Sequence, residues 1–337
     1  MSRTKKPHRS QGSIKSLVSA VIGISLIVAG LFLWINKQHV IDWLAYQSFE
    51  PTEEIVAIVD RTQMSDTGKF YFYASEPVVQ NAAQFNQSCE RKEPTSAILG
   101  CYANNRIYVY GVTDPRLDGI KEVTAAHEML HAAYQRLGSS EKAALNELLE
   151  NEYKKAQGDE DLAARMEFYA KYEAGERYNE LHSIVATEFA SIDPKLEAHY
   201  QRYFTDRSAV VTLHDTYASV FASLKAHSDE LLAQLEELGP QIESQSTAYN
   251  AAVRQLNADI QSFNARATSG DFSSQSAFNA ERSRLVARAD ALDRQRSQIN
   301  RDVATYERLR EEYNETAASS NELYKSMDSN LAPSPSV

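Results

Sequence analysis

The chain of 337 residues contains only two cysteines, which excludes a disulfide scaffold and a metal module held by several cysteines. Acidic residues are absent from positions 1–41, although Asp and Glu outnumber Lys and Arg by 46 to 35 in the whole chain. The formal net charge of −11 therefore combines a basic N-terminal tip with a strongly acidic remainder. Because an acidic surface repels phosphate backbones, we expect no nucleic-acid partner. A hydrophobic fraction of 43% argues against a disordered chain.

Charge of either sign is absent between Ser16 and Asn36, and residues 17–35 form an almost wholly apolar run. In a helix, a run of this length rises about 28 Å, which is close to the hydrocarbon thickness of a bilayer. The run is not followed by a small-residue cleavage site, so an uncleaved transmembrane helix is favoured over a cleaved signal peptide. Trp34 and Trp43 lie where interfacial aromatic side chains belong.

Basic residues predict the orientation of this helix. Five of them precede the apolar run and one follows it closely. Positive charge is retained on the cytoplasmic side, so residues 1–16 are expected to form a cytoplasmic tip. The sequence thus predicts a single-pass cell-membrane protein with the bulk of its chain outside the cytoplasm. The inverted topology, with the body in the cytoplasm, is a weaker alternative.

The two cysteines gain a meaning from this topology. Cys89 and Cys101 lie twelve residues apart in a region expected to be extracytoplasmic. A disulfide that closes such a loop would stabilise the fold by about 3 kcal/mol. Two free buried thiols are the alternative, because a sequence does not show the distance between them.

Short β-branched or aromatic runs between residues 54 and 112 predict the strands of a small sheet. These runs are Ile55–Val59, Phe70–Tyr73 and Arg106–Tyr110. Beyond Asp114-Pro115 the pattern is helical, with breaks at three glycines. The predicted helices cover residues 122–137, 140–157, 159–172 and 178–192, and Asp193-Pro194 predicts the start of another. The sequence therefore predicts an α+β domain over residues 50–212.

A seven-residue repeat of apolar residues begins near Leu213. One core position of its first arm carries Phe221, Leu235, Ile242, Tyr249, Leu256 and Phe263. After a polar break at residues 267–271, the repeat continues at strict sevens through Phe278, Leu285, Leu292, Ile299, Tyr306 and Tyr313. This pattern predicts an antiparallel coiled-coil hairpin over residues 213–327, with Phe263 facing Phe278. Residues 328–337 are expected to form a disordered tail.

The segment His127-Glu128-Met129-Leu130-His131 lies within the first of these predicted helices. Residues four apart on a helix lie one above the other, so both imidazoles can reach one tetrahedral Zn²⁺. Glu128 then projects beside the open coordination position, where it can take a proton from a bound water. The alternative is an ordinary helix with two surface histidines.

A zinc site needs a third protein ligand, and the predicted helix 178–192 offers three. In helical projection Glu188 falls within an apolar stripe, where a carboxylate is costly unless it is paired or bound to a metal. Glu188 is therefore the first choice. Glu180, at the edge of the same stripe, is the second, and His182, which points away from it, is the third. A glutamate that is not the ligand is expected to form a salt bridge with Arg177 or Lys195.

These motifs resemble the gluzincin group of zinc metallopeptidases, over roughly residues 107–192. The run from Asn179 to Ser183 is similar to the N-E-x-x-S run of thermolysin-like enzymes, and the run from Ala186 to Ala190 resembles the E-F-x-A ligand helix of other gluzincins. The resemblance implies His127 and His131 as zinc ligands, Glu128 as general base and Arg106–Tyr110 as the edge strand that aligns an extended peptide. Neither candidate glutamate is followed four residues later by the aspartate that often supports the first histidine in this group.

The sequence thus predicts a membrane-anchored, extracytoplasmic metallopeptidase that acts on a peptide or protein substrate with Zn²⁺ as its cofactor. Tyr178 or Tyr172 is available as an oxyanion donor. The competing hypothesis is a non-enzymatic envelope scaffold or adaptor in which the hairpin binds a protein partner and the H-E-x-x-H domain is inert. Bound zinc, lost when His127 is replaced, distinguishes the enzyme from the scaffold.

Overall fold

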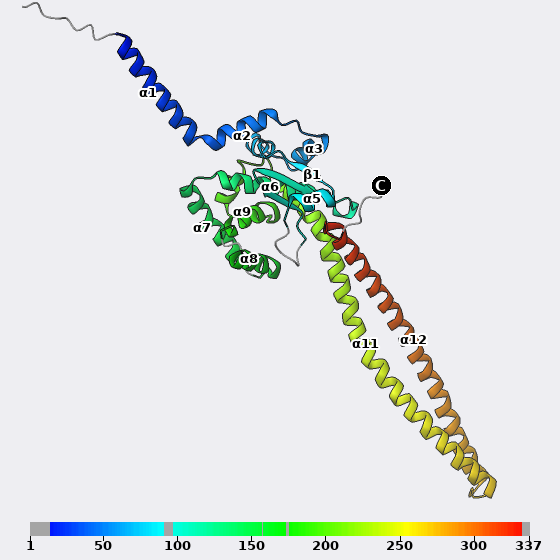
Figure 1. Ribbon diagram of the computed structural model, residues 1–337. Helices are drawn as coiled ribbons and strands as arrows, with labels where there is room; N and C mark the ends of the chain where they lie inside the picture. The colour runs from blue at the N-terminus through cyan, green and yellow to red at the C-terminus, as the bar shows by residue number, and fades with distance from the viewer. Residues whose placement is uncertain (1–13, 91–96, 157, 173–174, 332–337) are drawn as a thin grey trace, which may run out of the picture. The chain divides into compact units, whose positions relative to one another are not determined.

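The computed structural model describes residues 14–90, 97–156, 158–172 and 175–331 (Figure 1). Its described part is mostly helical, with one three-stranded sheet, and so belongs to the α+β class. The chain divides into two compact units. The first unit contains residues up to Thr216 together with those from Met327 onward, and the second contains Tyr217–Ser326. The predicted basic tip lies almost wholly outside the described residues, which begin at Ile14.

The first helix, α1 (Ile14–Ile35), covers the whole apolar run. Its large apolar side chains face outward: Val18, Val21, Ile22, Ile24, Leu26, Ile27, Val28, Leu31, Phe32 and Trp34 are all exposed. Within the described residues, no single helix meets the length and hydropathy expected of a membrane span. Val21–Phe32 of α1 and the next helix, α2 (Lys37–Ser48), meet them only as a pair, with a bend of 75° between them.

Two of the predicted strands are helices. Ile55–Val59 lies in α3 (Glu53–Arg61), and Phe70–Tyr73 lies in α4 (Asp66–Ala74). Each helix begins at a hydroxyl cap, since Thr52 accepts from the Ile55 N–H and Ser65 accepts from the Gly68 N–H. The strand prediction was wrong because short apolar runs fit both periods, and in α3 the buried residues follow the helical spacing.

The third predicted strand, Arg106–Tyr110, is confirmed as β3 but is central in the sheet. It pairs in parallel with β1 (Val78–Gln80) and antiparallel with β2 (Gly100–Ala103), so the strand order is β1-β3-β2. The expectation that Arg106–Tyr110 is an edge strand was therefore wrong. The edge strand beside it is β2, which was not predicted from the sequence.

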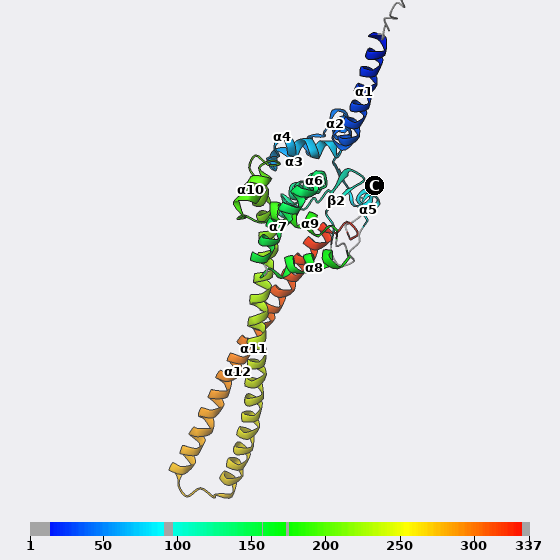
Figure 2. The same cartoon turned by 90° about the vertical axis from the view of Figure 1, so that its left-hand side faces the viewer.

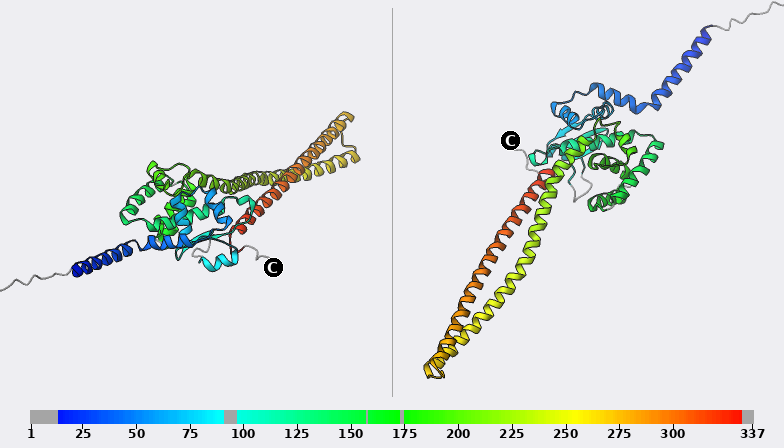
Figure 3. Two further views of the ribbon diagram at one scale, coloured as in Figure 1. Left: turned by 90° about the horizontal axis from the view of Figure 1, so that it is seen from above. Right: turned by 180° about the vertical axis from the view of Figure 1, so that it is seen from behind.

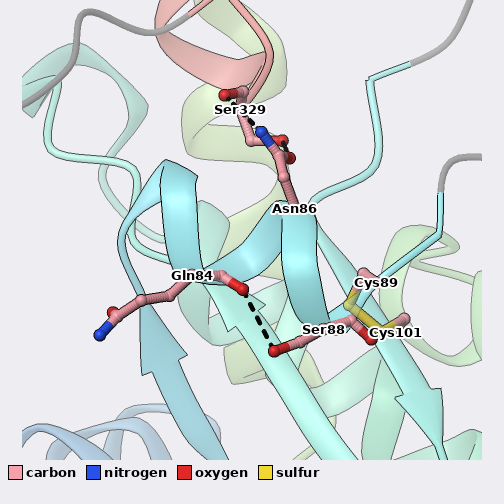
Figure 4. The surroundings of a disulfide bond; sticks show 6 residues. All are labelled: Gln84, Asn86, Ser88, Cys89, Cys101 and Ser329. Atoms are coloured by element: carbon pink, nitrogen blue, oxygen red, sulfur yellow. Dashed lines mark hydrogen bonds between the residues drawn. A yellow bond between two sulfur atoms is a disulfide. The ribbon is translucent and has the colours of Figure 1, made fainter.

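The disulfide between Cys89 and Cys101 is present (Figure 4). Cys89 follows helix α5 (Ala82–Ser88), and Cys101 lies in β2, so the bond ties the edge strand to that helix. Nearby, Asn86 donates its amide to the Ser329 carbonyl (3.0 Å) and accepts from the Ser329 hydroxyl (2.5 Å).

These bonds change the interpretation of the C-terminal tail. Asp328 and Ser329 are buried in the first unit, so the prediction that disorder begins at residue 328 was wrong. The signal that was missed is a polar pairing with α5, more than two hundred residues away in the sequence. The rest of the predicted tail, from residue 332, lies outside the described residues.

The remaining helices of the first unit lie close to where the sequence predicts them. After a short 3₁₀ turn (Pro115–Leu117), they are α6 (Ile120–Arg136), α7 (Ser139–Lys155), α8 (Glu160–Tyr172), α9 (Arg177–Glu188) and α10 (Pro194–Tyr200). Asp193 caps α10 by accepting from the Lys195 N–H, as predicted. Helix α9 ends four residues before the predicted boundary because the backbone is extended at Phe189, where the buried Arg207 guanidinium binds its carbonyl.

Helix α6 is the centre of the first unit. It packs against α9, against α3 and α4, and against β2 and β3. Its buried small residues, Ala125, Ala126, Ala132 and Ala133, allow these elements to approach its backbone closely. The helix that carries the H-E-x-x-H segment is therefore the most constrained element of the unit.

Two long helices form the second unit, α11 (Ser208–Ser269, from Tyr217 onward) and α12 (Gln275–Met327). They run alongside each other and are joined at one end by a short loop (Figures 2 and 3). The rings of Phe263 and Phe278 lie 5.0 Å apart, which confirms the predicted pairing across the turn. Phe272 in the loop packs against both rings and closes the end of the hairpin.

Candidate metal centre

The start of α6 is held from two sides. Gly119 precedes the helix with φ +96°, a left-handed conformation that favours glycine. A Cβ at this position would also lie only 2.9 Å from the backbone oxygen of Leu213. The guanidinium of Arg61 bonds to Asp118, before the helix, and to Glu122, in its first turn. These contacts fix where the helix begins and therefore where its histidines lie.

His127 and His131 lie one turn apart on α6, with ring centroids 4.7 Å from each other. Glu180, in the first turn of α9, faces both of them. Its Oε2 is 3.3 Å from Nε2 of His127, and its Oε1 is 3.3 Å from Nε2 of His131. Three side chains from two packed helices thus converge on one point.

The separations between these atoms fit a tetrahedral metal site. Nitrogen and oxygen ligands of Zn²⁺ lie about 2.0–2.2 Å from the ion, so two ligands at tetrahedral angles are roughly 3.3–3.5 Å apart. Both imidazole-to-carboxylate distances in this cluster are 3.3 Å. The residues present therefore fit a group that takes two imidazoles and one carboxylate.

Nδ1 of His131, the ring nitrogen that does not face Glu180, has a hydrogen-bond partner. Ser183, one turn after Glu180 on α9, places Oγ 3.4 Å from Nδ1 of His131, and the same hydroxyl donates to the Asn179 carbonyl. The serine oxygen can then accept from an Nδ1–H, so Nε2 is the nitrogen that would bind a metal. A contact of this kind would hold a metal-binding histidine in the tautomer that it needs; it supports the second histidine of the segment, not the first, which the missing aspartate would support.

The buried charges of this cluster depend on one another. Burial opposes protonation of His131, but the Glu180 carboxylate outweighs burial and raises the pKa of His131 to about 10. Burial likewise opposes ionisation of Glu180, but the two imidazoles hold its pKa well below the ordinary value. A cation bound between them would take over the role of the imidazolium charge.

Glu128 lies beside the imidazoles, next to the edge strand. The ligand atoms of His127, Glu128 and His131 all lie within 4.8 Å of one another. Burial raises the pKa of Glu128, which brings this carboxyl closer to the range that suits a proton acceptor. The backbone of Tyr102 in β2 lies close enough to the Glu128 carboxylate to lower its pKa slightly.

The edge strand approaches Glu128 closely because Gly100 has no side chain. A Cβ at Gly100 would lie 2.6 Å from Oε1 of Glu128. The Leu99 carbonyl accepts from the Tyr110 N–H of β3. In β2, Cys101 therefore turns its backbone N–H and C=O toward β3, whereas Gly100 and Tyr102 turn theirs toward the free edge. Sequence reasoning missed this strand, although the pairing of Cys101 with Cys89 was a signal of its place.

Glu188, the first choice for the third ligand, is not brought against the imidazole nitrogens. Its carboxylate pairs with the Arg165 guanidinium at 2.8 and 2.9 Å and lies 3.9 Å from Nε2 of His214. Burial opposes its ionisation, but the hydrogen bonds from Arg165 lower its pKa. Glu188 thus forms a salt bridge, but with Arg165 and not with the Arg177 or Lys195 expected from the sequence, and Glu180 is the glutamate that faces both imidazoles.

His182 lies behind the cluster in a fully buried aromatic environment. Its Nε2 is 3.0 Å from Nε2 of His199, and its ring packs against Tyr134 and Tyr200. Burial, together with His199, lowers its pKa well below the ordinary value. A neutral imidazole that pairs with His199 is a core residue in this arrangement.

The two tyrosines considered as oxyanion donors are not placed against the imidazoles. Tyr172 is 63% exposed at the end of α8. Tyr178 is half-buried at the start of α9, and the Arg177 guanidinium lies 5.1 Å from its ring centre. Among the described contacts, none joins the Tyr178 hydroxyl to His127 or His131, so its catalytic role stays a prediction.

Comparison with models of protein families, with curated proteins and with solved structures gave no match to this chain. The functional assignment therefore rests on the geometry of the cluster formed by His127, Glu128, His131 and Glu180.

Proposed function

We propose that this protein is a zinc-dependent metallopeptidase anchored to the cell membrane by α1, with the bulk of its chain outside the cytoplasm. The observation that carries the proposal is the position of Glu180, whose two carboxylate oxygens face the Nε2 atoms of His127 and His131 at equal distances. Two imidazoles and one carboxylate are a ligand set of catalytic zinc sites, which keep one coordination position open.

The neighbouring groups support hydrolysis. A bound zinc ion would lower the pKa of a coordinated water toward neutrality. Glu128, buried beside the histidines, is placed to accept a proton from the attacking water and to deliver it to the leaving amine. Burial raises its pKa, which favours the first half of this transfer, the acceptance of the proton.

The edge strand β2 supports a peptide substrate. Gly100 and Tyr102 present their carbonyl groups on the edge away from β3, and among the described strands β2 has no other partner. An extended peptide can add to such an edge through main-chain hydrogen bonds. Gly100 on this edge lies directly against Glu128, so a peptide on the edge would lie next to the proton acceptor.

The membrane anchor is supported by α1 itself. Its apolar side chains are exposed, and no charged residue interrupts them from Ser16 to Asn36. Burying such side chains in lipid removes a large apolar area from water. The asymmetry of the flanking basic residues supports a cytoplasmic N-terminus.

Metal analysis of the purified full chain tests the proposal. We expect about one zinc ion per chain, lost on His127→Ala and on Glu180→Gln. Glu188→Gln is the matched control, since it removes a half-buried carboxylate of the same helix that pairs with Arg165 instead. A folded chain that binds no metal would favour the scaffold hypothesis.

One observation favours the scaffold hypothesis. The hairpin of Tyr217–Ser326 is a compact unit in its own right. Its helices pair through buried apolar residues such as Leu231, Leu256 and Ile299. A hairpin of this kind can bind a protein partner whether or not the first unit is an enzyme.

A further inference from the structure

The helix after the anchor, α2, has an apolar face that points away from the domain. Ile41, Trp43 and Leu44 are 41%, 51% and 56% exposed, and Val40 between them is half-buried. On a helix, residues 40, 41 and 44 share one face, with Trp43 at its border. Three polar residues, also exposed, lie on the same face: Lys37, Gln47 and Ser48. We call the side chains of Val40, Ile41, Trp43 and Leu44 the outer face of α2.

The opposite face of α2 is fixed to the domain. The ring of Tyr46 packs against Phe70 and Tyr73 of α4. Asp42, which is 2% exposed, binds the Arg136 guanidinium through both of its oxygens, at 2.6 and 2.7 Å. With this side held by aromatic packing and by a buried ion pair, α2 cannot turn its outer face inward.

An exposed apolar face of this kind is expected to be buried against a partner. Single exposed apolar residues are common on proteins, but a contiguous group on a helix directly after an exposed apolar helix is not. Only Asn36 separates α2 from α1, whose apolar side chains are also exposed. The outer face therefore continues the apolar surface of α1, which we already propose to lie in a bilayer.

We propose that α2 lies in the interfacial region of the membrane that holds α1, with its outer face toward the acyl chains and Lys37 among the lipid phosphates. A helix in this position buries its apolar side by about 5–10 Å, and tryptophan is favoured at this depth. The position of α2 rests on the proposed membrane anchor and is independent of the proposed chemistry, whereas the substrate class drawn from it rests on the proposed hydrolysis.

The buried ion pair between Asp42 and Arg136 connects α2 to the helix that carries the proposed metal ligands. Arg136, the partner of Asp42, ends the helix α6 that carries His127 and His131. His131 precedes Arg136 by five residues, which is about 8 Å along the helix. If α2 rests on the bilayer, the metal centre is held beside it in one orientation. The substrates that fit this arrangement are protein segments close to the membrane surface.

The chain carries only two tryptophans, which makes the inference directly measurable. Full-length protein with Trp34→Phe has Trp43 as its only tryptophan, and the matched variant Trp43→Phe has only Trp34. Each variant is placed in vesicles of phosphatidylcholine and phosphatidylglycerol. Fluorescence is then quenched by lipids that carry a spin label near the headgroup or at the end of the acyl chain, or by iodide in the water.

We expect Trp43 to lose emission to the headgroup-proximal label and to resist iodide. Leu44→Glu should shift Trp43 toward iodide quenching, whereas Val286→Glu, which changes an exposed valine of the hairpin, should not. Quenching of Trp43 by iodide alone would overturn the inference. Resistance to both quenchers would overturn it too, because a protein contact would then cover the outer face.

The Trp34 variant separates this inference from the anchor on which it rests. Loss of Trp34 emission to a lipid label, together with iodide quenching of Trp43, would leave the anchor intact and overturn only the interfacial position of α2. Iodide quenching of both tryptophans would overturn the anchor as well. Neither result bears on zinc binding, which is measured on the same protein by metal analysis.

Discussion

Gly100 on the edge strand lies directly against Glu128 on α6, since a Cβ at Gly100 would be 2.6 Å from Oε1 of Glu128, so the proposed proton acceptor and the proposed substrate edge are in direct contact. This contact joins residues from two elements that the disulfide and the packing of α6 hold in place. It also means that the position of Glu128 depends on the strand as well as on its own helix.

Replacing Glu128 by Gln separates binding from chemistry. Glutamine keeps the shape of the side chain but cannot accept the proton, so we expect hydrolysis to fall by about 10²–10⁴-fold. The zinc content should be unchanged, because Glu128 is not among the three proposed ligands. Peptide hydrolysis and metal content are measured on the same preparation, and undiminished hydrolysis would remove Glu128 from the mechanism.

Ser183 is expected to tune the metal site without holding the ion. Ser183→Ala removes the oxygen that faces Nδ1 of His131, so zinc affinity should fall by about 10–100-fold. Competition with a chelator measures this change. Thr187→Ser is a suitable control because Thr187 is also buried on α9 and its hydroxyl bonds only within the helix. Equal affinity in Ser183→Ala and the parent protein would contradict the supporting role.

The disulfide is expected to stabilise the edge strand and the site together. Replacing both Cys89 and Cys101 by Ser should lower the free energy of unfolding by about 3 kcal/mol, since the closed loop is short. We also expect weaker peptide hydrolysis, because Cys101 lies between the two residues of β2 that approach Glu128. Denaturant unfolding and a peptidase assay check the two effects. Full activity in the double variant would show that β2 is held without the bond.

Breaking the ion pair between Asp42 and Arg136 should lower the free energy of unfolding more than replacing both residues by apolar ones. Both side chains are buried, so Asp42→Asn alone is expected to destabilise the first unit by about 3–5 kcal/mol. The double variant Asp42→Leu, Arg136→Met should recover much of this loss, because no unpaired charge remains. Denaturant unfolding of the single and double variants measures the difference. A single variant as stable as the parent would contradict the structural role of the pair.

The sequence predicts the helices better than the sheet. The helices from α6 to α10 and the hairpin show clear periodicity, breaks and caps, which are local signals. The runs Ile55–Val59 and Phe70–Tyr73 are β-branched or aromatic and favour strands locally, but the caps Thr52 and Ser65 and the packing against α6 and α2 make them helical. Tertiary packing outweighed the local preference there.

The candidate site shows the same division between local and long-range information. The spacing of His127 and His131 on one helix is local, so both were found from the sequence. The choice between Glu180 and Glu188 was not local. Both are on α9, and the burial argument applied to Glu188 was sound, but its partner is Arg165 of α8. A helical projection shows which side a carboxylate faces and not which group lies opposite it.

The central claim is that Glu180 completes a zinc site with His127 and His131. Its most direct test is the zinc content of the full chain with Glu180→Gln, measured beside the parent and beside Glu188→Gln after dialysis against a chelator at one fixed concentration. The account predicts one zinc ion per chain in the parent and in Glu188→Gln, and loss of zinc in Glu180→Gln. Zinc retained in Glu180→Gln, or lost only in Glu188→Gln, would contradict it.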